Sequence, residues 1–124
     1  MKREVRIKVG ELEVKARFNE TDTATKVFEI LPITSNVNIW GDEIYFSIPV
    51  KIELGNARAV VSEGDLGYWP PGTAFCIFFG STPMSRGDEI RPASPVNVFG
   101  RITGDSKIFK KVTPGARIII EKVE

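Results

Sequence analysis

The chain has 124 residues, 42% of them hydrophobic and 27% charged, which suits one domain over 1–124 built around a single core. Its 17 basic and 16 acidic residues give a net charge of +1, without the basic stripe that nucleic-acid binding needs. Histidine is absent and Cys76 is the single cysteine, which excludes an intramolecular disulfide, a zinc site and the commonest general base.

The first elements along the chain are predicted to form a β-hairpin. Apolar and charged residues alternate over 5–9, and the alternation resumes over 12–18. A two-residue turn between these segments would pair Val9 with Leu12 and place both apolar sets on one face.

A helix is predicted over about 22–31. Apolar residues recur there at the spacing of one helical face, at Ala24, Val27, Phe28 and Leu31. Thr21 or Asp22 can cap its start, and Pro32 stops it. A second, short helical turn is predicted over about 105–112. One helical face of this length is too small for a helical domain, so the helix must lie on a sheet.

The rest of the chain is predicted to form short strands separated by turns rich in glycine and proline. The predicted strands are EIYFSIPVKI, NARAVV, GDLGYW, AFCIFF, VNVFGRI and ARIIIEKV. With the first hairpin they make seven or eight strands beside one good helix. This pattern predicts a mainly β fold in the form of a closed or nearly closed barrel, because closure removes exposed strand edges.

Few residue patterns indicate covalent or metal chemistry. Cys76 lies between aromatic and aliphatic neighbours, which raise a thiol pKa, so we interpret it as a packed, inert cysteine. The acidic pairs at 42–43 and 88–89 lie in turns that contain glycine, and we interpret them as turn residues. No glycine motif of the phosphate-binding kind is present. The sequence therefore predicts no metal site and no cofactor.

Aromatic residues are the most concentrated signal for a binding site. Trp40, Tyr45, Tyr68 and Trp69 all lie at the borders of predicted turns and strands. Large rings at such borders often line the mouth of a pocket. They also serve to fill the two ends of a small barrel, and the pattern alone leaves both roles open.

The start of the chain and its hydropathy bear on location. The opening MKREVRIKV alternates charged with apolar residues, whereas a secretory signal has a continuous apolar stretch. No apolar run approaches the roughly 18 residues of a membrane-spanning helix. We therefore expect a cytoplasmic protein with no membrane partner and no nucleic-acid partner, whose oligomeric state the sequence does not fix.

Three segments in order carry a family resemblance: WGDEIYFSIPV, EGDLGYWPPGTAFCIFFGSTPMS and IRPASPVNVFGRITGD. Together they resemble the prokaryotic cyclophilin-like family of unassigned function, also called atypical cyclophilins. The resemblance covers nearly the whole chain. It implies an eight-stranded barrel closed at its ends by helices, with a peptide groove on the outer face.

Ordinary cyclophilins are more distantly similar, and they isomerise the bond before proline, whose uncatalysed barrier is roughly 18–20 kcal/mol. They use an arginine in an apolar groove, and its guanidinium donates a hydrogen bond toward the prolyl nitrogen. The resemblance aligns that arginine with Ser47, the groove histidine with Val96 and the groove glutamine with Ala74. The groove tryptophan and leucine fall near Arg91 and Pro92.

Other groove positions keep a large side chain in this alignment. Phe75 or Cys76 takes the place of the paired phenylalanines, and Trp69 takes the place of a small residue on the adjacent strand. A tryptophan there would narrow or reshape the groove.

Two functions follow from these residues. The first is a domain that binds a small ligand or peptide in a remodelled groove, without efficient prolyl isomerisation. The alternative is a true but atypical peptidyl-prolyl isomerase with a displaced arginine. Arg58, Arg86 and Arg91 are the candidates, and Arg86 and Arg91 are preferred because they follow the AFCIFF strand. The residues expected to bind the substrate are Phe46, Tyr68, Trp69, Phe75 and Met84.

Overall fold

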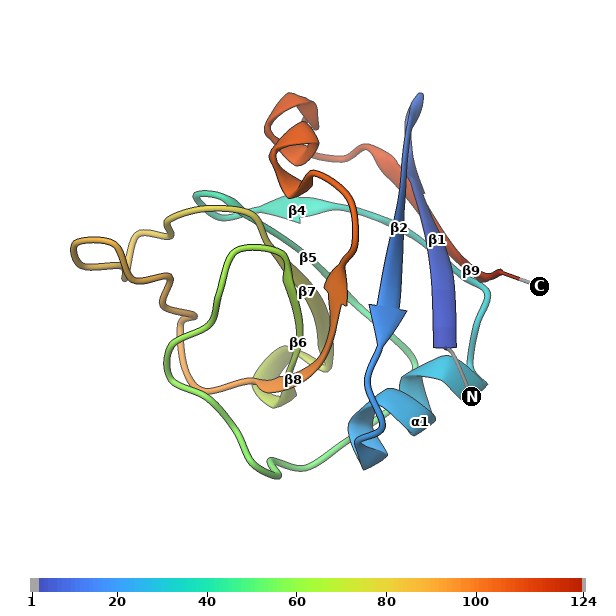
Figure 1. Ribbon diagram of the computed structural model, residues 1–124, viewed down its shortest axis with the longest axis horizontal. Coiled ribbons are helices and arrows are strands. Elements are labelled where there is room, and N and C mark those ends of the chain that lie inside the picture. Colours follow the sequence, from blue (N-terminus) through green and yellow to red (C-terminus); the bar gives the residue numbers. More distant parts are fainter. Residues whose placement is uncertain (1–2, 124) are drawn as a thin grey trace.

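The computed structural model describes residues 3–123 and contains one nine-stranded sheet, one α-helix and two 3-10 helices (Figure 1). The order of the strands across the sheet is β3-β9-β1-β2-β8-β6-β7-β5-β4. Along the chain the elements are β1 (Arg3–Val9), β2 (Leu12–Phe18), α1 (Asp22–Glu29), β3 (Ile33–Asn36), β4 (Asn38–Ile39), β5 (Glu43–Ser47), β6 (Asp65–Trp69), η1 (Pro70–Gly72), β7 (Ala74–Phe78), β8 (Asn97–Ile102), η2 (Ser106–Lys111) and β9 (Arg117–Lys122).

The sheet curls into a nearly closed barrel, which confirms the predicted fold class. Strands β3 and β4 lie at opposite ends of the sheet order, yet only Val37 separates them in the chain. The first pairs with β9 and the second pairs with β5, so one continuous segment joins both ends of the sheet. Its interruption at Val37, where the backbone N–H donates to Ala116 O at 2.9 Å, gives nine strands in place of the expected eight.

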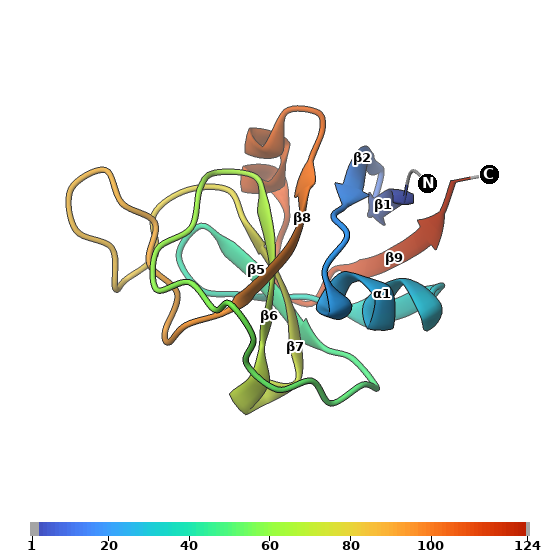
Figure 2. The same ribbon diagram turned by 60° about the horizontal axis from the view of Figure 1, so that its bottom comes forward.

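The local predictions with the clearest periodicity are confirmed. Strands β1 and β2 pair with Val9 opposite Leu12. The helix begins after Thr21, whose hydroxyl accepts a hydrogen bond from the backbone N–H of Ala24 at 3.2 Å, and it ends at Glu29. The short helical turn predicted over about 105–112 is also confirmed, as a 3-10 helix over Ser106–Lys111. Figure 2 shows α1 below β9 and the β1–β2 hairpin.

One predicted strand is absent and another is shorter than predicted. The segment 56–61 is not a strand, because Asn56 has a left-handed φ of 54° and the segment forms only isolated bridges, from Arg58 to Val96 and from Val61 to Ile90. The strand predicted over 43–52 ends at Ser47. The chain turns at Pro49, where the N–H of Val50 donates to Ile48 O at 2.9 Å.

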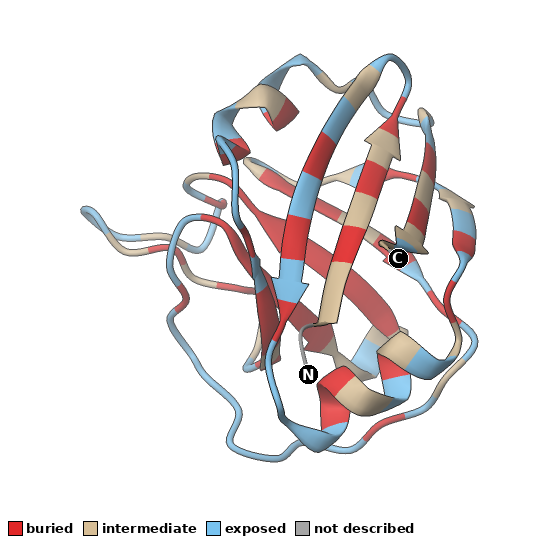
Figure 3. Cartoon of the chain, turned by 45° about the vertical axis from the view of Figure 1, so that its right-hand side comes forward, coloured by how far each residue is buried: buried red, intermediate tan, exposed pale blue. Residues whose placement is uncertain are grey.

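Two apolar clusters lie on opposite faces of the sheet, and Figure 3 shows where the buried residues fall along the strands. The larger cluster fills the barrel, and its aromatic centre consists of Phe18, Phe46, Phe75 and Phe99. The smaller cluster comprises Val61, Ala74, Cys76, Phe78, Ile90 and Val96 and packs with Tyr45 and Trp69. Strand β7 contributes to both, so all five of its residues are buried. In the part of the chain described, no helix is long and apolar enough to cross a membrane.

Candidate aromatic pocket

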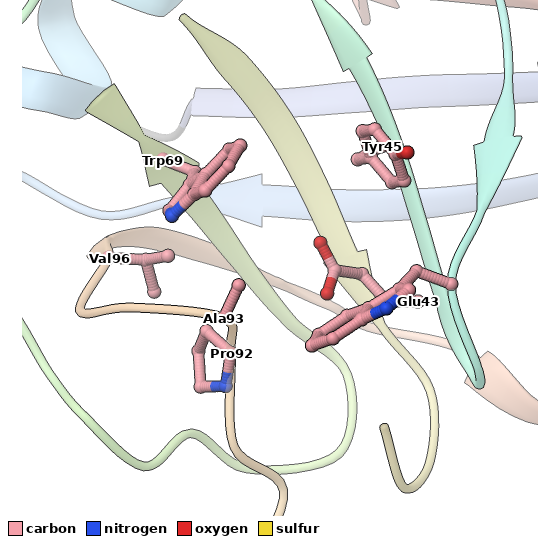
Figure 4. A pocket seen from close by; sticks show the side chains of 7 residues that line it. Glu43, Tyr45, Trp69, Pro92, Ala93 and Val96 are labelled. Carbon is pink, nitrogen blue, oxygen red and sulfur yellow. The ribbon is translucent and has the colours of Figure 1, made fainter. Parts of the chain in front are cut away.

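A pocket of about 230 Å³ lies against the smaller apolar cluster (Figure 4). Its side chains come from the β4–β5 turn, from strands β5 and β6, and from the segment that precedes β8. They are Trp40, Glu43, Tyr45, Trp69, Pro92, Ala93 and Val96. We call this site the aromatic pocket.

Strand register brings the rings and the acid together. The β4–β5 turn is closed by two hydrogen bonds, from Trp40 N to Glu43 O at 2.9 Å and from Glu43 N to Trp40 O at 3.2 Å. Glu43 and Tyr45 alternate with buried core residues along β5, so their side chains share the outer face of the sheet. Trp69 reaches the same face from β6, where it pairs with Ala74 of β7.

The segment 90–96 forms the opposite wall, and several contacts hold it in place. The Trp69 indole N–H donates to Ser94 Oγ at 2.6 Å, and the hydroxyl of Thr82 donates to Arg91 O. Gly67 lets this wall approach the sheet, because a Cβ at that position would lie 2.9 Å from Val96 Cγ2. The pocket is therefore preformed, with both walls tied to the barrel.

Glu43 is the acidic group of the pocket. Only 6% of its surface is exposed, and in Figure 4 its carboxyl points from β5 into the pocket, toward the side formed by Trp69, Ala93 and Val96. Burial raises the pKa of Glu43 from 4.5 to about 7, and a hydrogen bond with the Cys76 thiol opposes the rise. The carboxyl therefore changes its charge near neutral pH.

The structure corrects our interpretation of Glu43 as a turn residue placed for solubility. It is the first residue of β5 and is buried. The sequence contained a signal for this position, because alternate residues of a strand share one face. Glu43 therefore lies on the face of Tyr45, opposite to Ile44 and Phe46. The covering segment lies some 50 residues further along the chain, and local composition does not reveal it.

Cys76 lies beneath the pocket on β7 and is 1% exposed, as its apolar neighbours predicted. Burial raises the pKa of its thiol well above the usual value, and the charge of Glu43 raises it further. The thiol therefore stays protonated and contributes to packing.

The predicted substrate-binding residues divide among three places, the third of which holds Met84. Trp69 lines the aromatic pocket. Phe46, Tyr68 and Phe75 instead point into the barrel and are at most 1% exposed. The hydroxyl of Tyr68 donates to Val50 O at 2.8 Å and accepts from the Ile52 N–H at 3.1 Å, which fixes the chain after β5. These three side chains therefore form the core under the site.

Met84, Arg86 and Arg91 lie together in a different hollow, with Pro83 and Ser85. The guanidinium of Arg91 donates to both carboxyl oxygens of Glu89, at 2.9 and 3.1 Å. Neither arginine is among the side chains of the aromatic pocket.

Comparison with known proteins agrees with this architecture. A family model described as Cyclophilin-like matches residues 3–121. The chain belongs to the cyclophilin-like family. Its structure is also similar to the solution structure of a hypothetical protein from Archaeoglobus fulgidus, with 40% identity and a TM-score of 0.82, covering 98% of this chain and 95% of that one. No match is found among curated proteins.

Several positions that the resemblance aligned with the groove of ordinary cyclophilins come together in this member of the cyclophilin-like family. Trp69, Pro92 and Val96 all line the aromatic pocket. Ser47, aligned with the arginine, lies further along β5, where its hydroxyl donates to Gly72 O at 3.0 Å. The aromatic pocket thus presents rings and a carboxyl, without a guanidinium.

Proposed function

We propose that this cyclophilin-like protein binds a small, largely apolar ligand in the aromatic pocket and does not isomerise prolyl bonds efficiently. The observation that carries the proposal is a preformed hollow of about 230 Å³ bordered by two tryptophans, a tyrosine and one buried carboxyl. Concave sites with apolar walls and a few polar groups are typical of small-molecule binding. A cavity of about 150 Å³ holds benzene, so this one accommodates a ligand somewhat larger than one six-membered ring.

The same lining argues against prolyl isomerisation in this pocket. Weakening the resonance of the prolyl bond requires a donor aimed at the prolyl nitrogen, which an arginine supplies in ordinary cyclophilins. The residues that line the aromatic pocket include no arginine or lysine. A carboxylate there would accept a hydrogen bond where the reaction needs a donor.

Filling the pocket should abolish binding. Ala93 is exposed on its rim, so Ala93→Phe is expected to fold normally while its ring occupies the hollow. Trp40 and Trp69 are the two tryptophans of the chain, and both line the pocket, so their indole N–H signals in an NMR spectrum report ligand entry. Titration with cyclohexanol and 3,3-dimethylbutan-1-ol should shift both signals in the parent protein, and Ala93→Phe should weaken binding at least tenfold.

The matched control is Ala57→Phe, which adds the same ring to an exposed alanine of the 56–61 segment, outside the lining. It should bind both alcohols like the parent protein. If neither alcohol shifts the two indole signals, or if Ala93→Phe binds them unchanged, the aromatic pocket is not a site for small apolar ligands.

The isomerase alternative has one observation in its favour, since Met84, Arg86 and Arg91 line one hollow. We expect no acceleration of cis-trans relaxation in a proline-containing test peptide, even at high protein concentration, because Glu89 holds the Arg91 guanidinium. Acceleration that disappears in Arg86→Ala or Arg91→Ala would establish the alternative. Acceleration that remains in both variants would show that neither arginine is the catalytic group.

A further inference from the structure

The aromatic pocket has one charged group, and no lysine or arginine in the described part of the chain forms an ion pair with it. Among residues 3–123, no lysine or arginine lies within 4.0 Å of the Glu43 carboxyl oxygens. The titratable neighbours are Tyr45 on the same strand and Cys76 on β7, and neither carries positive charge.

The nearby charges are already paired with other residues. In the preceding turn, Asp42 lies 3.7 Å from the Lys110 ammonium. In the opposite wall, Arg91 pairs with Glu89 at 2.9 Å. A positive charge that balances the ionised Glu43 carboxylate can therefore come from a ligand that enters the pocket.

Three aromatic side chains border the space into which this carboxyl opens: Trp40, Tyr45 and Trp69. The faces of tryptophan and tyrosine rings attract cations through their quadrupole, and such rings recognise quaternary ammonium groups in other proteins. An anion would lie beside the Glu43 carboxylate, which repels it when ionised. The lining therefore favours positive charge on an apolar body.

We propose that the ligand of the aromatic pocket is a small organic cation, an alkylammonium compound whose charge lies against Glu43 and whose alkyl groups contact Trp40, Tyr45 and Trp69. The inference rests on the function proposed above and assigns its ligand class. The charge supplies specificity, and the apolar groups supply buried area. The pocket volume of about 230 Å³ suits a compound of the size of choline or a somewhat larger amine.

Binding of such a cation is linked to the charge of Glu43. The carboxyl is largely protonated below its pKa of about 7, and a cation binds best to the ionised form. A permanently charged ligand therefore binds more tightly as the pH rises, and it displaces a proton from the carboxyl where this group is protonated.

The test compares choline with 3,3-dimethylbutan-1-ol, which has the same shape with carbon in place of the charged nitrogen. Choline cannot lose its charge, so any dependence on pH comes from the protein. With the two indole N–H signals as the readout, choline should bind at least tenfold more tightly than the alcohol at pH 8. Its affinity should fall by up to about 100-fold between pH 8 and pH 5, as expected for a pKa near 7.

Two variants test whether the cation contacts the Glu43 carboxylate directly or responds to any negative charge near the pocket. Glu43→Gln keeps the shape of the side chain and should abolish both the preference for choline and its dependence on pH. Asp42→Asn removes the adjacent negative charge, which pairs with Lys110 and does not line the pocket. This variant should keep the parent preference.

Each outcome decides the inference. Equal affinity for choline and the alcohol, or a preference that survives Glu43→Gln, overturns the cation assignment while leaving pocket binding intact. Affinity for the alcohol that falls with rising pH would show that protonated Glu43 donates to neutral ligands, which also overturns it. If neither compound moves the indole signals, the proposed function fails as well.

Discussion

Glu43→Gln is expected to raise the free energy of unfolding by about 3 kcal/mol at pH 8 and to change it little near pH 4. The reason is the difference in pKa, which is about 7 in the folded protein and 4.5 for the unperturbed side chain. Below pH 4.5 both states carry the proton, and burial of the neutral carboxyl costs nothing further. Between these two values the unfolded state loses its proton while the folded state keeps it, so the stability of the parent protein falls as the pH rises.

Urea unfolding followed at several pH values between 4 and 8 measures this effect. The parent protein should lose stability across the interval, and Glu43→Gln should lose much less. The control is Glu121→Gln, because the pKa of Glu121 is lowered by Lys8 and Arg6 and its contribution falls away only toward acid pH. That variant should retain the parent's decline between pH 5 and pH 8. If the parent protein is equally stable at pH 5 and pH 8, burial does not raise the pKa of Glu43 and the prediction is wrong.

Phe75→Ala is expected to lower the free energy of unfolding by about 4 kcal/mol, a large share of the stability of a domain this size. The ring of Phe75 is fully buried and stacks on Phe46, with ring centroids 5.1 Å apart. It also meets Phe99 edge to face at 5.0 Å. Truncation would remove these contacts and leave a cavity inside the barrel. Urea unfolding at one fixed pH gives the value.

Phe75→Leu keeps most of the volume and tests whether Phe75 belongs to the binding site. The side chain points into the barrel, away from the aromatic pocket, so this variant should stay folded and bind the neutral alcohols as the parent does. A loss of less than 1 kcal/mol for Phe75→Ala would contradict the core position. Loss of alcohol binding in a folded Phe75→Leu would place the residue in the site.

Much of the barrel follows from local patterns in the sequence. The register of the first hairpin and the start of the helix depend on neighbouring residues alone, namely the pairing of Val9 with Leu12 and the cap at Thr21. The segment 33–39 was not predicted as strand because polar residues interrupt it. Its extended form depends on pairing with two strands distant in the chain, β9 and β5.

The site was less predictable, because its walls come from distant parts of the chain. Trp40, Tyr45 and Trp69 were singled out as large rings at the borders of turns and strands, and the family resemblance placed Trp69 at a groove position. Glu43 faces a wall that contains Pro92 and Val96, and the approach of Val96 to the sheet requires Gly67 on β6. A GDE sequence that resembles an exposed turn carries no trace of that covering wall.

The two faces of strand β7 belong to different parts of the molecule. Phe75 and Ile77 face the barrel core, while Ala74, Cys76 and Phe78 face the outer cluster under the pocket. Substitutions in the outward set change the floor of the binding surface while leaving the interior packing in place. The ligand preference of such a barrel can therefore change while its architecture stays the same, and membership of the cyclophilin-like family does not by itself specify an activity.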